Sequence, residues 1–199
     1  MKRLKLNNDQ INFIGTWDIE NIQLCKDIIN FFEKNIDLQK DGSTGDGKIL
    51  EIKKTTDINI HPKDLKEEKY EPIKRYMEQL HKCYLDYQEI WPFLKDKINT
   101  VDIPTFNIQK YNPGDHFSHI HTERSSLNSL HRVFAWMTYL NDVEDGGNTN
   151  FTHYNLKIKP EAGKTLIWPA EWTHAHCGEV LNKGVKYIIT GWMHFPTGE

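Results

Sequence analysis

The sequence predicts an α+β protein in which a double-stranded β-helix, or jelly roll, is supported by N-terminal helices. Two observations lead to this class. In the first hundred positions, apolar residues recur at the three-to-four spacing of helices with one buried face. After Asn99 the chain changes to short runs rich in β-branched and aromatic residues, separated by glycine, asparagine and aspartate turns. Helices followed by a succession of strands are typical of a two-sheet core buttressed by helices.

Two helices are predicted in the N-terminal half. The first covers 20–34, and Asp18 is the expected N-cap. Its apolar positions are Ile22, Cys25, Ile28, Ile29 and Phe32. The second covers 73–90, with Pro72 in its first turn and Pro92 beyond its end. The aromatic stripe of this second helix indicates packing against a sheet.

The remaining segments are predicted to be loops and strands. Glycine and polar residues make 40–48 a surface loop, of a kind that often lies over an active site. The predicted strands cover 102–111, 131–140, 149–152, 155–159, 164–168 and 185–195. We therefore expect a helical and strand support region over 1–100 and a jelly-roll catalytic core over 101–199, which together form a single domain.

Composition and charge narrow the class of protein. The 199 residues carry a formal net charge of −3, which argues against a nucleic-acid partner because phosphate backbones attract strongly basic surfaces. Cys25, Cys83 and Cys177 are an odd set without CxxC spacing, so neither a disulfide framework nor a cysteine zinc site is expected. Residues 1–10 are polar, and no apolar run is long enough for a bilayer. A cytoplasmic protein without membrane association is expected, and its oligomeric state is left open.

A candidate metal site lies in the stretch YNPGDHFSHIHTE, from Tyr111 to Glu123. His121 and Glu123 are two residues apart, so on extended backbone their side chains point to the same side. Two histidines and one carboxylate on one face of a metal leave its other positions open, as in non-haem Fe(II) oxygenases. The distant histidine is expected in Trp172-Thr-His-Ala-His, where both His174 and His176 are available.

Several motifs surround this pair. They are Tyr111, Gly114 and Phe117 before it, Arg132 and Met137-Thr-Tyr139-Leu-Asn141 after it, and the turn Glu144-Asp-Gly146-Gly147-Asn-Thr149. Over about 101–195, this combination resembles the prolyl 4-hydroxylase-like branch of the 2-oxoglutarate- and Fe(II)-dependent dioxygenases. The chain departs from that pattern twice, because the metal pair comes one residue later and its acid is glutamate where the family has aspartate. The second departure weakens any inference to prolyl substrates.

The C-terminal segment carries the most specific part of the resemblance. The family places a glycine two residues after the distal histidine, a basic residue about ten after it, and a tryptophan six beyond that. Counted from His176, these positions are Gly178, Lys186 and Trp192, whereas counting from His174 loses the register. The implied metal ligands are His121, Glu123 and His176. His174 is then a pocket residue or a histidine at a strand end.

The resemblance also implies a cosubstrate site. Lys186 supplies the cation that the far carboxylate of 2-oxoglutarate needs, and Tyr139 and Tyr111 are expected to donate hydroxyl hydrogen bonds to the same carboxylate. Trp192 is expected to wall this pocket. The implied reaction uses Fe(II), 2-oxoglutarate and O₂, releases succinate and CO₂, and hydroxylates an unactivated C–H bond.

Two rival interpretations and the substrate are left open. The same jelly roll serves as a non-catalytic binding module in other proteins, and two histidines with a glutamate also hold catalytic zinc in hydrolases. The chain lacks the helical HExxH motif of many zinc hydrolases. Peptidyl proline is the leading substrate by resemblance, with a free amino acid, another protein side chain or a small metabolite as alternatives.

Overall fold

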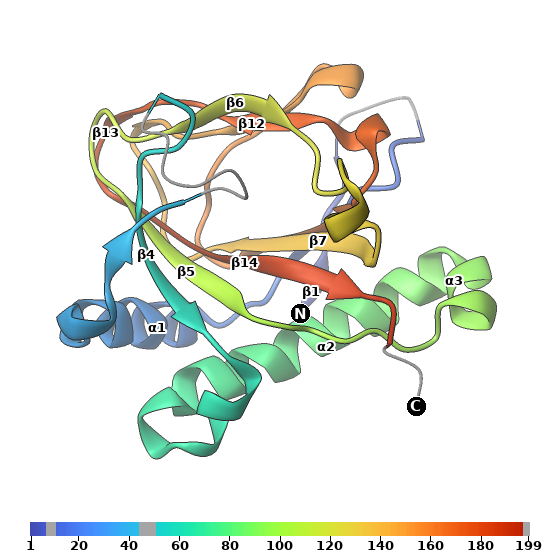
Figure 1. Ribbon diagram of the computed structural model, residues 1–199, viewed down its shortest axis with the longest axis horizontal. Helices are drawn as coiled ribbons and strands as arrows, with labels where there is room; N and C mark the ends of the chain where they lie inside the picture. The colour runs from blue at the N-terminus through green and yellow to red at the C-terminus, as the bar shows by residue number, and fades with distance from the viewer. Residues whose placement is uncertain (7–10, 44–50, 197–199) are drawn as a thin grey trace.

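Two facing sheets of antiparallel strands form the centre of the protein (Figure 1). The computed structural model describes residues 1–6, 11–43 and 51–196. The larger sheet has the order β1-β2-β11-β7-β14-β5-β4-β3, and the smaller has the order β10-β9-β12-β6. Strands of the larger sheet are β1 (Lys2–Arg3), β2 (Gly15–Asp18), β3 (Lys40–Asp41), β4 (Thr56–Ile60), β5 (Phe106–Tyr111), β7 (Arg132–Tyr139), β11 (Lys164–Pro169) and β14 (Lys186–His194). Those of the smaller are β6 (Phe117–His121), β9 (Thr149–Phe151), β10 (Leu156–Ile158) and β12 (His176–Gly178), and a separate pair joins β8 (Asp145–Gly146) to β13 (Leu181–Lys183).

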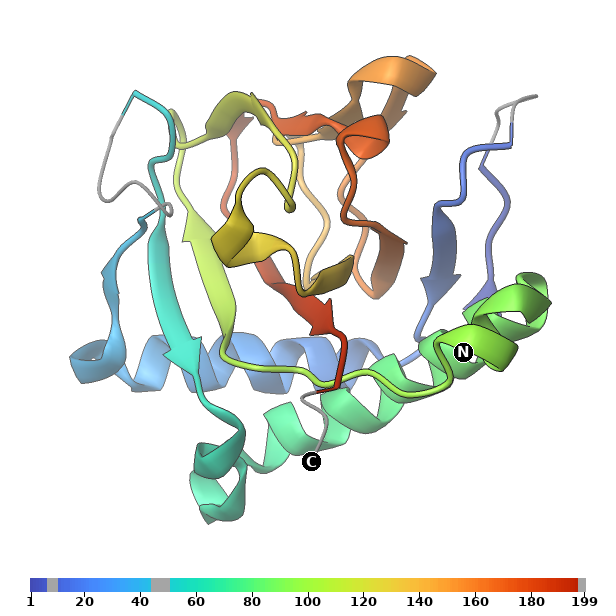
Figure 2. The same cartoon turned by 45° about the vertical axis from the view of Figure 1, so that its right-hand side comes forward.

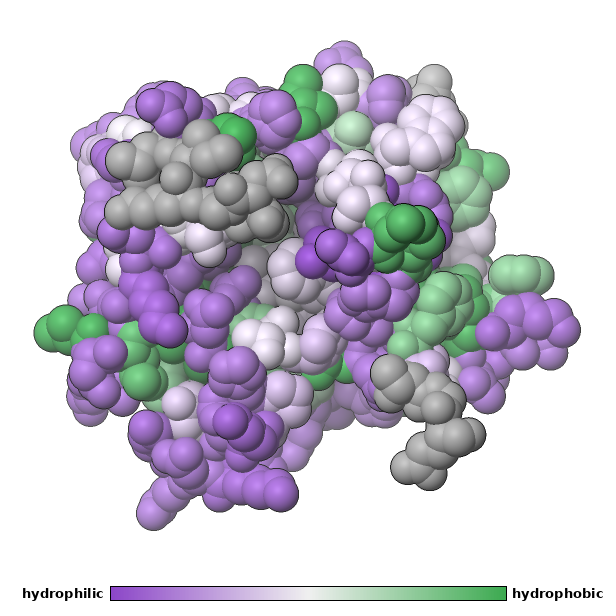
Figure 3. All heavy atoms as spheres, viewed as in Figure 1, coloured by the Kyte–Doolittle hydropathy of each residue, from purple (hydrophilic) through white to green (hydrophobic). Residues whose placement is uncertain are grey.

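Helices cover the outer face of the larger sheet. Figures 1 and 2 show α1 (Ile22–Lys34) and α2 (Glu71–Ile90) beneath this sheet, with α3 (Pro92–Lys97) following α2. Short 3-10 helices lie at Ile36–Leu38, Pro62–Lys66, Glu68–Tyr70, Leu127–Ser129, Thr152–Tyr154 and Trp172–His174. Among the described residues, no helix is long and apolar enough to cross a membrane. The face seen in Figure 3 is mostly hydrophilic, and its hydrophobic side chains are scattered.

The two predicted helices are confirmed, but their ends differ from the prediction. Asn21, not Asp18, caps α1, since its side chain accepts a hydrogen bond of 3.1 Å from the backbone N–H of Leu24. Asp18 instead accepts from the N–H of Glu20 in the turn before the helix. Pro92 does not lie in a loop beyond α2, because it begins α3, where a proline at the first position costs no hydrogen bond.

Alternation along the strands separates two cores. On β14, Ile189 and Met193 pack toward the helices, whereas Ile188 belongs to the core between the two sheets. Lys186 and Trp192, at even spacing from Ile188, line the same inner side. The inner face of the larger sheet therefore carries both the apolar floor and the polar groups of one cavity.

Each of the six predicted strand segments contains a strand, and the structure adds others. The N-terminal β2 and β4 belong to the same sheet as β5, β7 and β14, so both halves of the chain build it. The smaller sheet gains β6 and β12, which hold the two candidate histidine ligands His121 and His176. The loop predicted over 40–48 begins with β3, and its residues from 44 onward lie outside the described part of the chain.

Candidate active site

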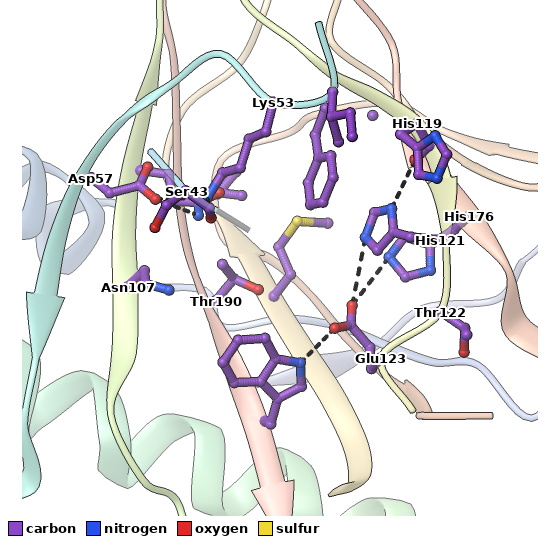
Figure 4. A pocket seen from close by; sticks show the side chains of 18 of the residues that line it. Ser43, Lys53, Asp57, Asn107, His119, His121, Thr122, Glu123, His176 and Thr190 are labelled. Atoms are coloured by element: carbon purple, nitrogen blue, oxygen red, sulfur yellow. Dashed lines mark hydrogen bonds and ion pairs between the residues drawn. The ribbon is translucent and has the colours of Figure 1, made fainter. Parts of the chain in front are cut away.

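Two neighbouring strands of the smaller sheet bring the candidate ligands together. β6 and β12 pair so that His121 lies directly opposite His176, and their ring centroids are 4.4 Å apart. Glu123 follows the end of β6, and its Oε1 lies 3.8 Å from Nε2 of His121 and 3.4 Å from Nε2 of His176. One ligand atom of each residue falls within 4.8 Å of the others. Figure 4 shows the carboxylate of Glu123 facing both rings.

Hydrogen bonds fix both imidazoles in the orientation that a metal needs. Nδ1 of His121 lies 2.9 Å from the carbonyl oxygen of His119, and Nδ1 of His176 lies 2.9 Å from that of His174. A carbonyl only accepts, so each Nδ1 carries a proton, and each Nε2 is the nitrogen turned toward Glu123 and the candidate metal position. Such outer hydrogen bonds are typical of metal-binding histidines. Phe117 stacks on the ring of His121 at 3.9 Å and holds it in place.

Burial and neighbouring charges set the protonation of the site. Desolvation, with the neighbouring His176 ring, lowers the pKa of His121 to about 4, so this imidazole is neutral at pH 7. Although burial opposes ionisation of Glu123, its hydrogen bond and charge interaction with His176 hold the pKa of the carboxyl at about 2. An ionised carboxylate beside a neutral imidazole is the state in which both groups bind a metal.

The donor set fits a divalent metal of the iron or zinc type. Two imidazole nitrogens and one carboxylate oxygen converge from one side, and the other side opens into a cavity of about 1160 Å³. That arrangement leaves coordination positions for other molecules, as in the two-histidine, one-carboxylate iron centres. His121, Glu123 and His176 are therefore the residues that would hold the ion.

The structure separates His174 from this group. Nε2 of His174 lies 2.7 Å from the carbonyl oxygen of Asn12, and its ring packs against Tyr154 with centroids 5.3 Å apart. Of the two histidines in this segment, only His176 faces Glu123. The backbone of His174 still contributes, because its carbonyl orients the ring of His176.

Glu123 has further partners on the larger sheet. The indole Nε1 of Trp192 donates a hydrogen bond of 2.5 Å to Oε2 of Glu123, marked by a dashed line in Figure 4. The guanidinium of Arg132 lies 3.7 Å from the centre of the Trp192 ring and donates from Nη1 to the backbone carbonyl of Glu123 at 2.9 Å. Trp192, predicted as a wall of the cosubstrate pocket, thus contacts a candidate metal ligand.

Lys186 lines the same cavity. The side chain is buried, and Nζ donates a hydrogen bond of 3.0 Å to the carbonyl oxygen of Gly147. Burial lowers the pKa of Lys186 to about 7. Within the described part of the chain, no carboxylate lies within ion-pair distance of this ammonium, so it fits an anion supplied by a ligand. Gly147 has a φ of +67°, and a Cβ there would lie 3.2 Å from Cδ of Lys186.

The motif around Asn141 positions Lys186. The side-chain amide of Asn141 donates to the carbonyl of Val185 at 2.7 Å, and its oxygen accepts from the N–H of Tyr187 at 2.8 Å. These two bonds tie the end of β7 to the residues on either side of Lys186. The Tyr-Leu-Asn motif therefore has a structural role at the site.

The two predicted tyrosines lie near Lys186 in different ways. Tyr111 lines the cavity and places its ring 3.9 Å from Nζ, whereas its hydroxyl donates to Oε1 of Gln109 at 2.8 Å. The hydroxyl of Tyr139 donates to Oγ1 of Thr149 at 2.6 Å, and it is Thr149 that lines the cavity. In this arrangement both hydroxyls are already engaged with protein acceptors.

A polar wall that the sequence motifs did not indicate completes the cavity. Lys53 and Asp57 are buried, and their Nζ and Oδ2 atoms lie 2.7 Å apart. The carboxylate of Asp57 also accepts from Thr55 at 2.7 Å and from Gln109 at 3.1 Å. Figure 4 shows Lys53 and Asp57 on one side of the pocket with the histidines on the other. No motif marked these residues, because their burial depends on the pairing of β4 with β5.

Comparisons with known proteins agree with the motifs. Residues 106–194 match the model of the 2OG-Fe(II) oxygenase superfamily. A probable prolyl 4-hydroxylase 9 from Arabidopsis thaliana is 27% identical over an alignment of 115 residues, and the match covers 45% of this chain and 40% of the relative. Prolyl 4-hydroxylase subunit alpha-3 from Homo sapiens is 31% identical over an alignment of 91 residues, and the match covers 40% of this chain and 16% of the relative. The chain thus spans well under half the length of these curated relatives.

Solved structures share the fold over nearly the whole chain. The viral collagen prolyl hydroxylase of Paramecium Bursaria Chlorella virus-1 has a TM-score of 0.67 at 18% identity, and covers 93% of this chain and 97% of its own. A prolyl hydroxylase from Trichoplax adhaerens, solved with a hypoxia inducible factor peptide, has a TM-score of 0.71 at 15% identity. The match covers 92% of this chain and 84% of that protein. The predicted jelly roll is confirmed by these likenesses. In motifs and fold, the chain resembles the prolyl 4-hydroxylase-like branch of the 2-oxoglutarate- and Fe(II)-dependent dioxygenases.

Proposed function

We propose that this protein is a 2-oxoglutarate- and Fe(II)-dependent oxygenase that hydroxylates an unactivated C–H bond. The observation that carries the proposal is one cavity lined both by the His-Glu-His group and by the buried Lys186, which has no ion-pair partner among the described residues. A keto diacid would span these two points, with its keto acid end toward the metal group and its far carboxylate at Lys186. The distant lysine distinguishes this site from a plain zinc site.

The chemistry comes from the bound groups, and the chain positions them. Bound Fe(II), with 2-oxoglutarate and O₂, supplies oxidation that converts R–H to R–OH while 2-oxoglutarate becomes succinate and CO₂. His121, Glu123 and His176 would hold the metal on one side, which leaves the cavity side for ligands. Lys186 would orient the cosubstrate by a charge-assisted contact to its carboxylate.

The residues between these two points govern access of water. Met137 and Ile188 line the cavity from the larger sheet, and Phe117 lines it from the smaller sheet. An apolar lining excludes water from the reacting atoms and strengthens charge interactions within the site. Such a lining suits this oxidation, because water at the reacting atoms would favour side reactions.

For the substrate, we propose a class of compound, which is an amino-acid residue within a peptide. Because of the relatives' names, peptidyl proline is the first substrate to test, and other amino-acid residues follow. The neighbour from Trichoplax adhaerens was solved with a peptide, which supports a peptide over a small metabolite. The polar wall of Lys53, Asp57 and Gln109 offers hydrogen-bond partners to such a substrate.

Anaerobic spectroscopy tests the proposal directly. Addition of Fe(II) and 2-oxoglutarate should produce a weak visible absorption from the keto-acid chelate, and the His176→Ala variant should lack it. A screen of proline-containing peptides and free amino acids would then look for succinate above the uncoupled background. Absence of the visible band in the wild-type protein, with the metal bound, would exclude the oxygenase and favour the zinc-type or binding-module interpretation.

A further inference from the structure

The two oxygens of Glu123 face different partners. Oε1 lies 3.4 Å from Nε2 of His176 and 3.8 Å from that of His121, so it points into the metal position. Oε2 accepts the 2.5 Å hydrogen bond from the indole of Trp192. The indole of Trp192, on the larger sheet, therefore orients the carboxylate by binding the oxygen that faces away from the two histidines. In this orientation it offers one oxygen, not two, to a metal.

A second contact holds the backbone of the same residue. Nη1 of Arg132 donates to the carbonyl of Glu123 at 2.9 Å and lies 3.9 Å from its Oε2. The Arg132 guanidinium also lies 3.7 Å from the centre of the Trp192 ring, which fixes the plane of the indole. Arg124 in turn donates to the carbonyl of Arg132 at 2.8 and 2.6 Å. The whole group forms one connected network around Glu123.

The identity of the acid explains why such a network is needed. A glutamate has one more methylene and one more rotatable bond than an aspartate, so its carboxylate has more conformations to lose on binding a metal. Glu123 also lies beyond the end of β6, where no strand pairing restrains it. A hydrogen bond from the partly buried indole of Trp192 restricts the longer side chain before the metal arrives.

We propose that Trp192 and Arg132 are positioning residues that hold Glu123 as a single-oxygen metal ligand. The proposal rests on the metal group proposed above. It assigns Trp192 a role through Glu123, which is separate from walling the cosubstrate pocket. Arg132 acts on Glu123 in two ways. It donates a hydrogen bond to the backbone carbonyl of Glu123, and its guanidinium packs on the indole of Trp192.

Metal affinity is the first test, because it does not depend on turnover. Binding of Mn(II) or Co(II) would be measured by anaerobic calorimetry in the Trp192→Phe variant, which keeps an aromatic ring but removes the N–H. Loss of an outer partner of a metal ligand weakens affinity by about 10- to 100-fold. Trp172→Phe is the matched control, because Trp172 lies at the cavity and is 67% exposed, and its affinity should be unchanged. Unchanged or raised affinity in Trp192→Phe would overturn the proposal.

A double-mutant cycle separates positioning from a general structural effect. In Glu123→Asp the shorter acid cannot reach both the metal position and the indole, so the hydrogen bond is already lost. Trp192→Phe should then reduce metal affinity little further in the Glu123→Asp background. If the two effects add in full, Trp192 does not act through Glu123, and the inference fails.

A third measurement uses the metal-free wild-type protein, so it decides even if the tryptophan variant does not fold. In protein labelled with ¹⁵N-tryptophan, one indole N–H resonance should be shifted strongly downfield and protected from exchange, and it should move in Glu123→Asp. Absence of such a resonance would refute the hydrogen bond itself. Failure of the wild-type protein to bind any metal would instead refute the proposed function, while this resonance would still report on the hydrogen bond.

Discussion

The ammonium of Lys186 lies 3.9 Å from the centre of the Tyr111 ring, with the carbonyl of Gly147 as its hydrogen-bond acceptor. Tyr111 therefore offers the face of its ring to the cation, while its hydroxyl donates to Gln109. A cation between a ring face and one carbonyl is incompletely solvated, because an ammonium has three donors. The remaining donors are available to a carboxylate that enters the cavity.

The Lys186→Met substitution tests this assignment. Methionine keeps most of the volume but removes the charge, and loss of a charge-assisted contact costs about 1.5 to 3 kcal/mol. The apparent constant for 2-oxoglutarate should therefore rise by about tenfold or more. Lys183→Met is the matched control, since Lys183 is exposed on the neighbouring β13. An unchanged cosubstrate constant in Lys186→Met would remove Lys186 from the site.

Cosubstrate binding should also depend on pH. Burial lowers the pKa of Lys186 to about 7 in the free protein, whereas a bound carboxylate favours the charged form and raises it. Binding above pH 7 therefore takes up a proton, so affinity should fall as the pH rises, by at most about tenfold per pH unit. Titrations of the Mn(II)-loaded protein between about pH 6 and about pH 8.5 would measure this slope.

The Lys186→Arg variant is the control for the pH effect. Arginine stays protonated throughout this range, so its weaker binding should be independent of pH. His121 does not interfere, because its pKa of about 4 lies below the range. Equal slopes in the two proteins would show that another group titrates.

The periodicity of apolar residues predicted the helices and strands whose residues are close together in the sequence. The strand over 185–195 and the helix over 73–90 have strong periodicity, and both are found as β14 and α2. The family resemblance placed His176, Lys186 and Trp192 in register, and all three line one cavity. Lys186 and Trp192 share one face of β14, because even spacing on a strand keeps side chains on the same side. Those parts of the site were accessible from sequence.

Other parts depend on contacts between distant segments. β4 is a short strand within a polar stretch, and the burial of Asp57 follows from pairing of β4 with β5. The hydrogen bond from Trp192 to Glu123 joins residues on opposite sheets, and spacing along the chain carries no information about it. The cap of α1 was also missed, since Asp18 and Asn21 are both good capping residues and only the backbone path selects Asn21.

The buried pair on the polar wall should matter for stability. Asp57→Asn leaves the ammonium of Lys53 buried, at 4% exposure, without its countercharge. Breaking a buried ion pair on one side costs about 3 to 5 kcal/mol, and urea denaturation would measure this loss. The exposed pair of Lys95 with Glu89 is the control, because Glu89→Gln should change stability by no more than about 0.5 kcal/mol.

Replacement of both partners separates charge from packing. With Lys53→Met and Asp57→Leu together, no unpaired charge remains, and much of the lost stability should return. A double variant as unstable as Asp57→Asn alone would show that the hydrogen bonds from Thr55 and Gln109, not the charge pair, carry the effect.

The assignment of His176 rather than His174 as a ligand predicts opposite outcomes for two neighbouring substitutions. His176→Ala removes an Nε2 that faces Glu123, so metal binding should be abolished with little change in the melting temperature, because an open metal site contributes little to the core. His174→Ala removes a hydrogen bond to Asn12 and packing against Tyr154, so it should lower the melting temperature but keep metal affinity within about tenfold. Calorimetry with Mn(II) and thermal denaturation measure both quantities on each variant. Retained metal binding in His176→Ala, together with loss in His174→Ala, would reverse the assignment.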